Sequence, residues 1–96
     1  MIRHTVVFTL KHAEGSAAEK KFLADADVLK KIPGVQKFEK LRQVSKKNGY
    51  AFGFSMEFDD AAAYQEYNDH PEHVRFVKER WMPEVAEFLE IDYERL

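Results

Sequence analysis

The sequence of 96 residues contains no cysteine, three prolines and four glycines, and it lacks any long apolar run. Without cysteine the chain has no disulfide and no thiolate metal site, which suits a reducing compartment, so we expect a cytoplasmic protein. No apolar run approaches the roughly 20 residues that cross a bilayer and no signal peptide is visible, so we expect no membrane partner. The formal net charge of −2 lacks the basic excess that a phosphate backbone attracts, which argues against nucleic acid.

Motifs of several enzyme classes are missing as well. There is no Gly-rich phosphate loop, no Gly-x-Ser-x-Gly elbow and no cysteine nucleophile, so hydrolase and nucleotide-enzyme functions have no support. What is present is the composition of a folded protein, with 45% hydrophobic residues and eight phenylalanines. The length fits a single domain over residues 1–96. A domain of this size has a modest core, and self-association would supplement it.

Alternation of apolar and polar residues, together with β-branched and aromatic enrichment, predicts four strands. They span residues 2–10, 35–44, 50–58 and 88–93. Asn48 and Gly49 form a strong hairpin signal between the second and the third strand. The second strand is rich in charged residues, which is typical of the edge of a sheet.

Three helices are predicted between these strands. They cover residues 17–31, 61–67 and 71–82. Ser16 and Glu19 have the spacing of a capping box at the start of the first. Pro71 favours the first position of the last helix, which we expect to stop before Pro83 because proline cannot continue the ladder. The order β-α-β-β-α-β predicts an α+β, ferredoxin-like fold, with helices on one face of an antiparallel-rich sheet.

The first and third predicted strands each have a bulky face and a nearly flat one. The flat face carries Thr5, Val7, Thr9, Ala51, Gly53 and Ser55. Since the helices cover only one side of the sheet and small residues let two sheets approach closely, we expect a face-to-face homodimer through this surface. A solvated polar face is the alternative.

Groups able to transfer protons cluster only in the segment from Tyr67 to Val74. His73 falls in the first turn of a predicted helix, where amide dipoles disfavour a cation and lower the pKa of an imidazole, keeping it neutral as a base. Tyr67 lies across the Pro71 corner, and a phenol can donate to a developing oxyanion while imidazole removes a proton. His73 and Tyr67 are therefore the candidate catalytic residues, for chemistry beside a carbonyl.

The bulky strand face would form the wall of a pocket beside these two residues. The candidate substrate-binding residues are His4, Val6, Phe8, Phe52, Phe54 and Met56. A mostly apolar pocket with a few convergent polar groups suits a small hydrophobic or aromatic ligand. The competing interpretation makes these residues core, with His70 serving as a helix cap.

Three histidines make a metal site the alternative to this pocket. His70, His73 and His4 could supply three nitrogens for zinc or iron. However, His70 precedes the helix while His73 lies within it, so their side chains need not point the same way. We expect neither a metal nor another cofactor.

Several of these segments together resemble the Dabb family, the stress-responsive A/B barrel domains, over nearly the whole chain. They are Met1-Ile2-Arg3-His4 with Val6 and Phe8, Ile32-Pro33-Gly34-Val35, the aromatic strand from Tyr50, Tyr67-x-x-His70-Pro71-x-His73, and Ile91-Asp92-Tyr93. The resemblance implies a ferredoxin-like monomer that dimerises through its sheet into an α+β barrel. Most members have no assigned activity.

A plant polyketide cyclase of this family, which performs an aldol-type ring closure, uses a histidine and a tyrosine. The resemblance places those roles on His73 and Tyr67, with His4 matching a pocket histidine. Two further polar positions of that pocket fall on Phe52 and near Asp25, which weakens any expectation of polyketide specificity.

Three functions follow from the sequence. The first is a stress-responsive domain of unassigned activity, a dimer holding a small apolar ligand without turnover. The second is a cofactor-free lyase, cyclase or isomerase with His73 as base, Tyr67 as oxyanion donor and His4 positioning the substrate. The third is a haem-degrading monooxygenase of similar barrel shape.

Overall fold

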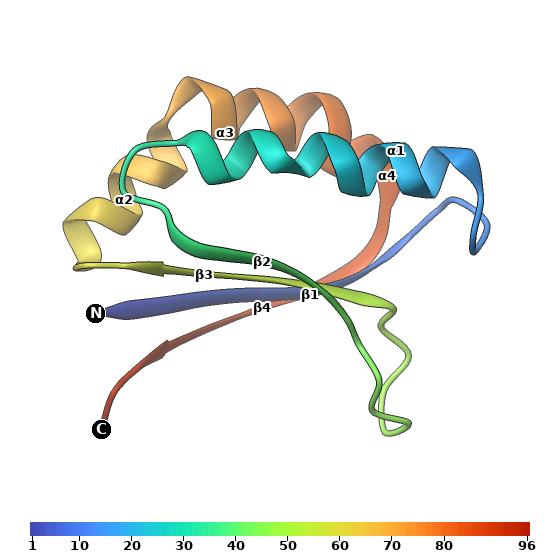
Figure 1. The fold of residues 1–96 in the computed structure, drawn as a ribbon, viewed down its shortest axis with the longest axis horizontal. Coiled ribbons are helices and arrows are strands. Elements are labelled where there is room, and N and C mark those ends of the chain that lie inside the picture. The colour runs from blue at the N-terminus through green and yellow to red at the C-terminus, as the bar shows by residue number, and fades with distance from the viewer.

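Four antiparallel strands form one sheet in the order β2-β3-β1-β4, and the helices all lie on one side of it (Figure 1). The computed structural model describes residues 1–96. Its elements are β1 (Ile2–Leu10), α1 (Ala17–Asp25), the 3₁₀ helix η1 (Ala26–Lys31), β2 (Gln36–Arg42), β3 (Phe52–Phe58), α2 (Ala61–Asp69), α3 (Pro71–Phe76), the π-helical η2 (Val77–Trp81), α4 (Met82–Glu84) and β4 (Val85–Glu94). The predicted ferredoxin-like arrangement is confirmed.

Side-chain caps explain where the helices begin. The Ser16 hydroxyl accepts a hydrogen bond from the amide of Glu19 at 3.2 Å, and the Glu19 carboxylate accepts one from the amide of Gly15 at 3.1 Å. The Asp60 carboxylate accepts from the amide of Ala63 at 2.8 Å and so starts α2. Each cap satisfies an amide that has no partner inside its helix.

Two helical predictions need correction in detail. Residues 17–31 are helical as predicted, but η1 is wound as a 3₁₀ helix. The last helical region does not stop before Pro83, because α4 includes it and ends at Glu84. The amide of Met82 donates to the carbonyl of Val77, five residues back, as in a π-helix. The spacing of the backbone hydrogen bonds therefore changes just before Pro83, which has no N–H to donate and lies in the first turn of α4.

The hairpin between β2 and β3 exists, but its connection is longer than an Asn-Gly turn. Residues 43–51 lie outside both strands, so β2 and β3 are shorter than predicted. The amide of Gln43 still donates to the carbonyl of Ala51 at 2.9 Å, but side chains bind other backbone groups of this loop. The Gln43 amide group donates to the Tyr50 carbonyl at 2.7 Å, and Asn48 Oδ1 accepts from the Tyr50 amide at 3.0 Å.

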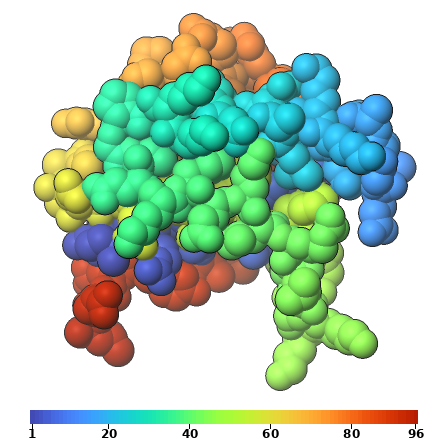
Figure 2. Space-filling view, viewed as in Figure 1, coloured from blue at the N-terminus to red at the C-terminus, as the bar shows by residue number.

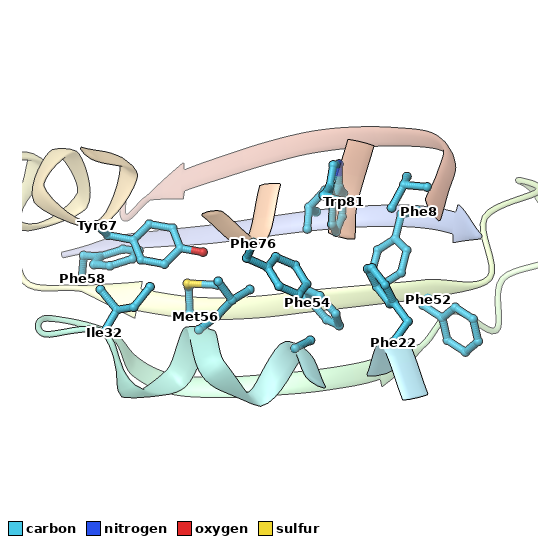
Figure 3. Packing of buried hydrophobic residues seen from close by; sticks show 14 residues of the cluster. Phe8, Phe22, Ile32, Phe52, Phe54, Met56, Phe58, Tyr67, Phe76 and Trp81 are labelled. Carbon is cyan, nitrogen blue, oxygen red and sulfur yellow. The ribbon is translucent and has the colours of Figure 1, made fainter. Parts of the chain in front are cut away.

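One cluster of fourteen buried apolar residues fills the space between the sheet and the helices (Figure 3). The ring of Phe8 is fully buried and packs against Phe22, Phe54 and Trp81 with ring centroids 6.0, 4.7 and 4.9 Å apart. Burial of such rings is the main source of stability in a domain of this size. The predicted bulky faces of β1 and β3 are therefore the core faces.

The other side of the sheet carries no helix. Cross-strand pairing places Thr5 opposite Ser55 and Ile91, and Val7 opposite Gly53 and Leu89, so these residues share the uncovered face. The loop after β2 and the C-terminal residues extend past the sheet on this side (Figures 1 and 2). The uncovered face is thus flanked by projecting segments at both ends.

Candidate active-site pocket

A cavity of about 210 Å³ lies between the core face of the sheet and the helical layer. Its lining is mostly apolar, and its polar groups belong to His4, Tyr67, His73 and Glu90. The lining residues are His4, Val6, Leu29, Phe54, Met56, Tyr67, His73, Phe76, Val77, Trp81, Met82, Phe88 and Glu90. This combination is typical of a site for a small organic ligand.

His73 is held as a neutral base. Its Nδ1 atom lies 3.0 Å from the carbonyl oxygen of Asn68, which can only accept, so Nδ1 carries the proton and Nε2 keeps its lone pair. Burial lowers the pKa of His73, and the nearby His4 adds to this effect, while the Asn68 carbonyl opposes it. The lowering was predicted, but its main cause is loss of solvent rather than helix amide dipoles.

Tyr67 presents a hydroxyl without a partner in the chain. The ring is buried among Phe58 and His73, with centroids 5.1 and 4.5 Å away. In Figure 3 its hydroxyl points away from Phe58, towards the middle of the cluster. Burial raises the pKa of Tyr67 well above that of a free phenol, and no hydrogen bond contributes. The hydroxyl therefore stays protonated and can donate to a ligand.

His4 belongs to a polar triangle at the edge of the cavity. Its Nδ1 atom lies 2.6 Å from Asp92 Oδ1 and 2.9 Å from the Tyr64 hydroxyl, which in turn donates to Asp92 Oδ2 at 2.8 Å. The carboxylate only accepts, so Nδ1 of His4 carries the proton and Nε2 is its free nitrogen. Burial raises the pKa of Tyr64, and the Asp92 carboxylate raises it further, so this hydroxyl remains a donor.

The structure brings most of the predicted site residues together around this cavity. Those that line it are His4, Val6, Phe54, Met56, Tyr67 and His73. Phe8 and Phe52 do not. Phe8 is enclosed in the core, and Phe52 lies at the far end of the cluster from Tyr67, beneath the Arg42 guanidinium (Figure 3).

Sequence reasoning missed the contribution of the last strand. Asp92 pairs across from His4, and Glu90 across from Val6, so both carboxylates face the helices. The sequence shows that these carboxylates alternate with Leu89 and Ile91. It does not show the register between β1 and β4, and this register places the carboxylates beside the cavity. Tyr64 was missed too, although it lies one helical turn before Tyr67 and so shares its face.

Two histidines outside the cavity have structural partners. His70 Nδ1 accepts a hydrogen bond from the amide of Glu72 at 3.1 Å, so His70 is the helix cap that the sequence suggested. His12 Nε2 bonds to the Glu84 carboxylate at 2.7 Å. No three His, Asp or Glu side chains are grouped as metal ligands, and none of the helices could cross a membrane.

Comparison with a family model places the chain among known domains. The model of the stress-responsive A/B barrel domain, Dabb, matches residues 2–95. A Dabb family protein of Mesorhizobium loti with a ferredoxin-like fold is 66% identical, with a TM-score of 0.98 over 99% of this chain and 96% of that one. No match is found among curated proteins.

More distant structures share the fold. A hydroxynitrile lyase of Passiflora edulis is 18% identical, with a TM-score of 0.82 over 96% of this chain and 90% of that one. A dimeric protein of unknown function from Bacteroides fragilis is 22% identical, with a TM-score of 0.71 over 98% and 95%. At these identities the likeness concerns the fold alone.

Proposed function

The chain belongs to the stress-responsive A/B barrel domain family, and we propose that this member catalyses proton transfer beside the carbonyl group of a small, largely apolar molecule, using its own side chains. The observation that carries the proposal is the pairing in one apolar cavity of a neutral imidazole with a free Nε2 and a phenol with an unpaired hydroxyl. Neither atom is sealed in the core without a partner, so both are open to a ligand in the cavity.

The chemistry follows from these two groups. His73 Nε2 takes a proton from the carbon next to the carbonyl, and the electrons of that C–H bond move into the carbonyl to form an enolate. The Tyr67 hydroxyl donates a hydrogen bond to the oxygen on which the charge develops. Return of the proton to the opposite face of that carbon re-forms the carbonyl and completes an isomerisation. Alternatively, the enolate carbon attacks the carbon of a second carbonyl group. The first carbonyl then re-forms, the π bond of the second breaks, and its oxygen takes the proton held by His73.

The size of the cavity restricts the ligand. A cavity of roughly 150 Å³ suffices for benzene. At about 210 Å³, this one suits a single ring with a short carbonyl-bearing arm. It is well below the ~300 to 1,000 Å³ of sites for drug-sized ligands. This volume favours a ligand much smaller than a haem macrocycle, so we do not propose the monooxygenase.

A fold alone does not fix activity, and the family likeness does not supply one. The Passiflora hydroxynitrile lyase carries a lyase site on a similar fold. The proposal for this chain therefore depends on its own residues, and its test has to separate turnover from simple binding.

Exchange of the methyl protons of acetophenone in deuterium oxide, followed by ¹H NMR, measures the proposed step directly. His73→Asn keeps a donor towards Asn68 but lacks the base, and Tyr67→Phe lacks only the hydroxyl. Loss of either group should slow exchange about 100-fold or more.

The matched controls are His12→Gln and Tyr50→Phe, which remove the same groups outside the cavity. Both should exchange at the wild-type rate. Exchange that persists in the His73 and Tyr67 variants would reject the mechanism. Tight binding of acetophenone without exchange would instead favour a domain that holds its ligand without turnover.

We also infer that the chain forms a homodimer through the uncovered face of its sheet. The predicted residues Thr5, Val7, Thr9, Ala51, Gly53 and Ser55 give this face its flat centre. Leu89, Ile91 and Tyr93 add exposed apolar side chains beside it, on an open surface of a kind that usually marks an interface. A Bacteroides fragilis protein of similar fold is dimeric, which supports the assembly of two chains.

Sedimentation equilibrium at micromolar concentration tests the homodimer. Wild type should have the mass of two chains, and Ile91→Asp, which buries a charge in the proposed interface, should have the mass of one. Val74→Asp places the same charge on the exposed surface of α3 and should remain dimeric. A single-chain mass for wild type contradicts the inference.

A further inference from the structure

Glu90 brings a carboxylate to the cavity without a partner to neutralise it. The residue lines the cavity, lies across from Val6 in the sheet register and is exposed to solvent. It takes part in none of the ion pairs of the chain, whose carboxylates come from other residues. Its charge is therefore available to anything that enters.

The remaining lining residues offer no positive charge in compensation. Neither lysine nor arginine lines the cavity. His73 is kept neutral mainly by burial, and Nδ1 of His4 is bonded to the Asp92 carboxylate at 2.6 Å. Glu90 is thus the one unbalanced charge among the thirteen lining residues.

The field of this carboxylate reaches the proposed catalytic groups. Burial is the larger cause of the raised pKa of Tyr67, and the charge of Glu90 is the second. The same charge partly opposes the lowering of the His73 pKa. Water weakens the field of the exposed Glu90, but the lining between it and the ligand space is mostly apolar and screens charge poorly, so part of the field acts on a bound ligand.

We propose that Glu90 makes the pocket selective for uncharged carbonyl compounds over carboxylates and other anions. This deepens the proposed function and rests on it for the carbonyl group. An anion would have to give up water while approaching a fixed negative charge, and the single hydrogen bond that the Tyr67 hydroxyl can donate would offset only part of that loss. The excluded ligands are free carboxylic acids and other small anions whose charge would enter the cavity.

Benzamide and benzoate provide a matched pair of probes, since they share shape and differ in charge. Trp81 is the only tryptophan and lines the cavity, so its fluorescence reports binding of either probe to the whole protein. Wild type should bind benzamide about tenfold more tightly than benzoate. Glu90→Gln, which keeps the shape of the side chain, should remove most of this preference by tightening benzoate alone.

Two further variants make the result specific. Glu66→Gln removes an exposed carboxylate on α2 that has no ion pair, and the preference should stay at the wild-type value. Glu90→Lys reverses the charge and should make benzoate the better ligand.

The outcomes separate this inference from the proposed function. If both probes bind and the preference is the same in wild type, Glu90→Gln and Glu90→Lys, the role of Glu90 is overturned while the ligand pocket stands. If neither probe changes the Trp81 fluorescence of any variant, the pocket and the selectivity are overturned together.

Discussion

The Nδ1 atom of His4 lies 2.6 Å from a carboxylate oxygen of Asp92, although 88 positions separate the two residues in the chain. The contact exists because β4 returns antiparallel beside β1 and pairs these residues directly. Tyr64, from the helical layer, bonds to both partners. One polar triangle therefore ties the two strands to α2 and sets the tautomer of a histidine at the cavity.

Removal of the Asp92 carboxylate should loosen this triangle. We expect Asp92→Ala to lower the free energy of unfolding by about 1 to 2 kcal/mol, because a largely buried imidazole N–H loses its charged acceptor. Imidazole ¹⁵N shifts should show Nδ1–H for His4 in wild type and a mixture of tautomers in the variant. An unchanged tautomer would mean that Tyr64 alone fixes the ring.

The pH dependence of exchange should follow His73. Burial lowers its pKa below the ordinary 6.5, so the neutral base persists as the pH falls through that value. The kcat/KM for acetophenone exchange should stay level near pH 7 and decline only on the acid side of 6.5. A decline that begins above this value would contradict the assignment of His73 as the base.

The neighbouring His70 should matter for stability and not for exchange. Its Nδ1 atom caps α3 through the amide of Glu72 and does not line the cavity. His70→Ala should therefore cost about 1 kcal/mol in denaturant unfolding, as loss of a helix cap usually does. A drop in exchange comparable with that of His73→Asn would show that the two histidines act together.

The Phe8 side chain should be a structural residue, although it was a predicted ligand contact. It is fully buried beside Phe22 and Trp81, so Phe8→Ala should destabilise the fold by about 3 to 5 kcal/mol. Phe88→Ala is the matched control, because Phe88 lines the cavity and is 48% exposed. Phe88→Ala should weaken benzamide binding with a smaller loss of stability. A larger loss of stability in Phe88→Ala than in Phe8→Ala would contradict the assignment of Phe8 to the core and Phe88 to the cavity.

The fold could be predicted because its signals are local and agree with one another. Alternation in residues 2–10 placed His4, Val6 and Phe8 on one face, and the capping box at Ser16 started α1 where it was expected. Turns and ends were predicted less well. A π-helical turn let the helix continue through Pro83, and the binding of Gln43 and Asn48 to their own loop shortened the strands.

The candidate site could be predicted only where one segment contained it. Tyr67 and His73 are separated by a single corner, so their nearness followed from local structure. Asp92 and Glu90 required the pairing of the first strand with the last, a long-range register that no local pattern encodes. Trp81 and Phe88 also lie beside the cavity through a long-range contact. The helical layer packs on the sheet there, and the two rings touch.

The most direct test of the account is a crystal structure of the protein with bound acetophenone. We predict the carbonyl oxygen within about 3.2 Å of the Tyr67 hydroxyl and the methyl carbon about 3.5 Å from His73 Nε2, the geometry that proton transfer requires. A cavity filled by its own side chains, or a ligand bound away from these two residues, would contradict the account.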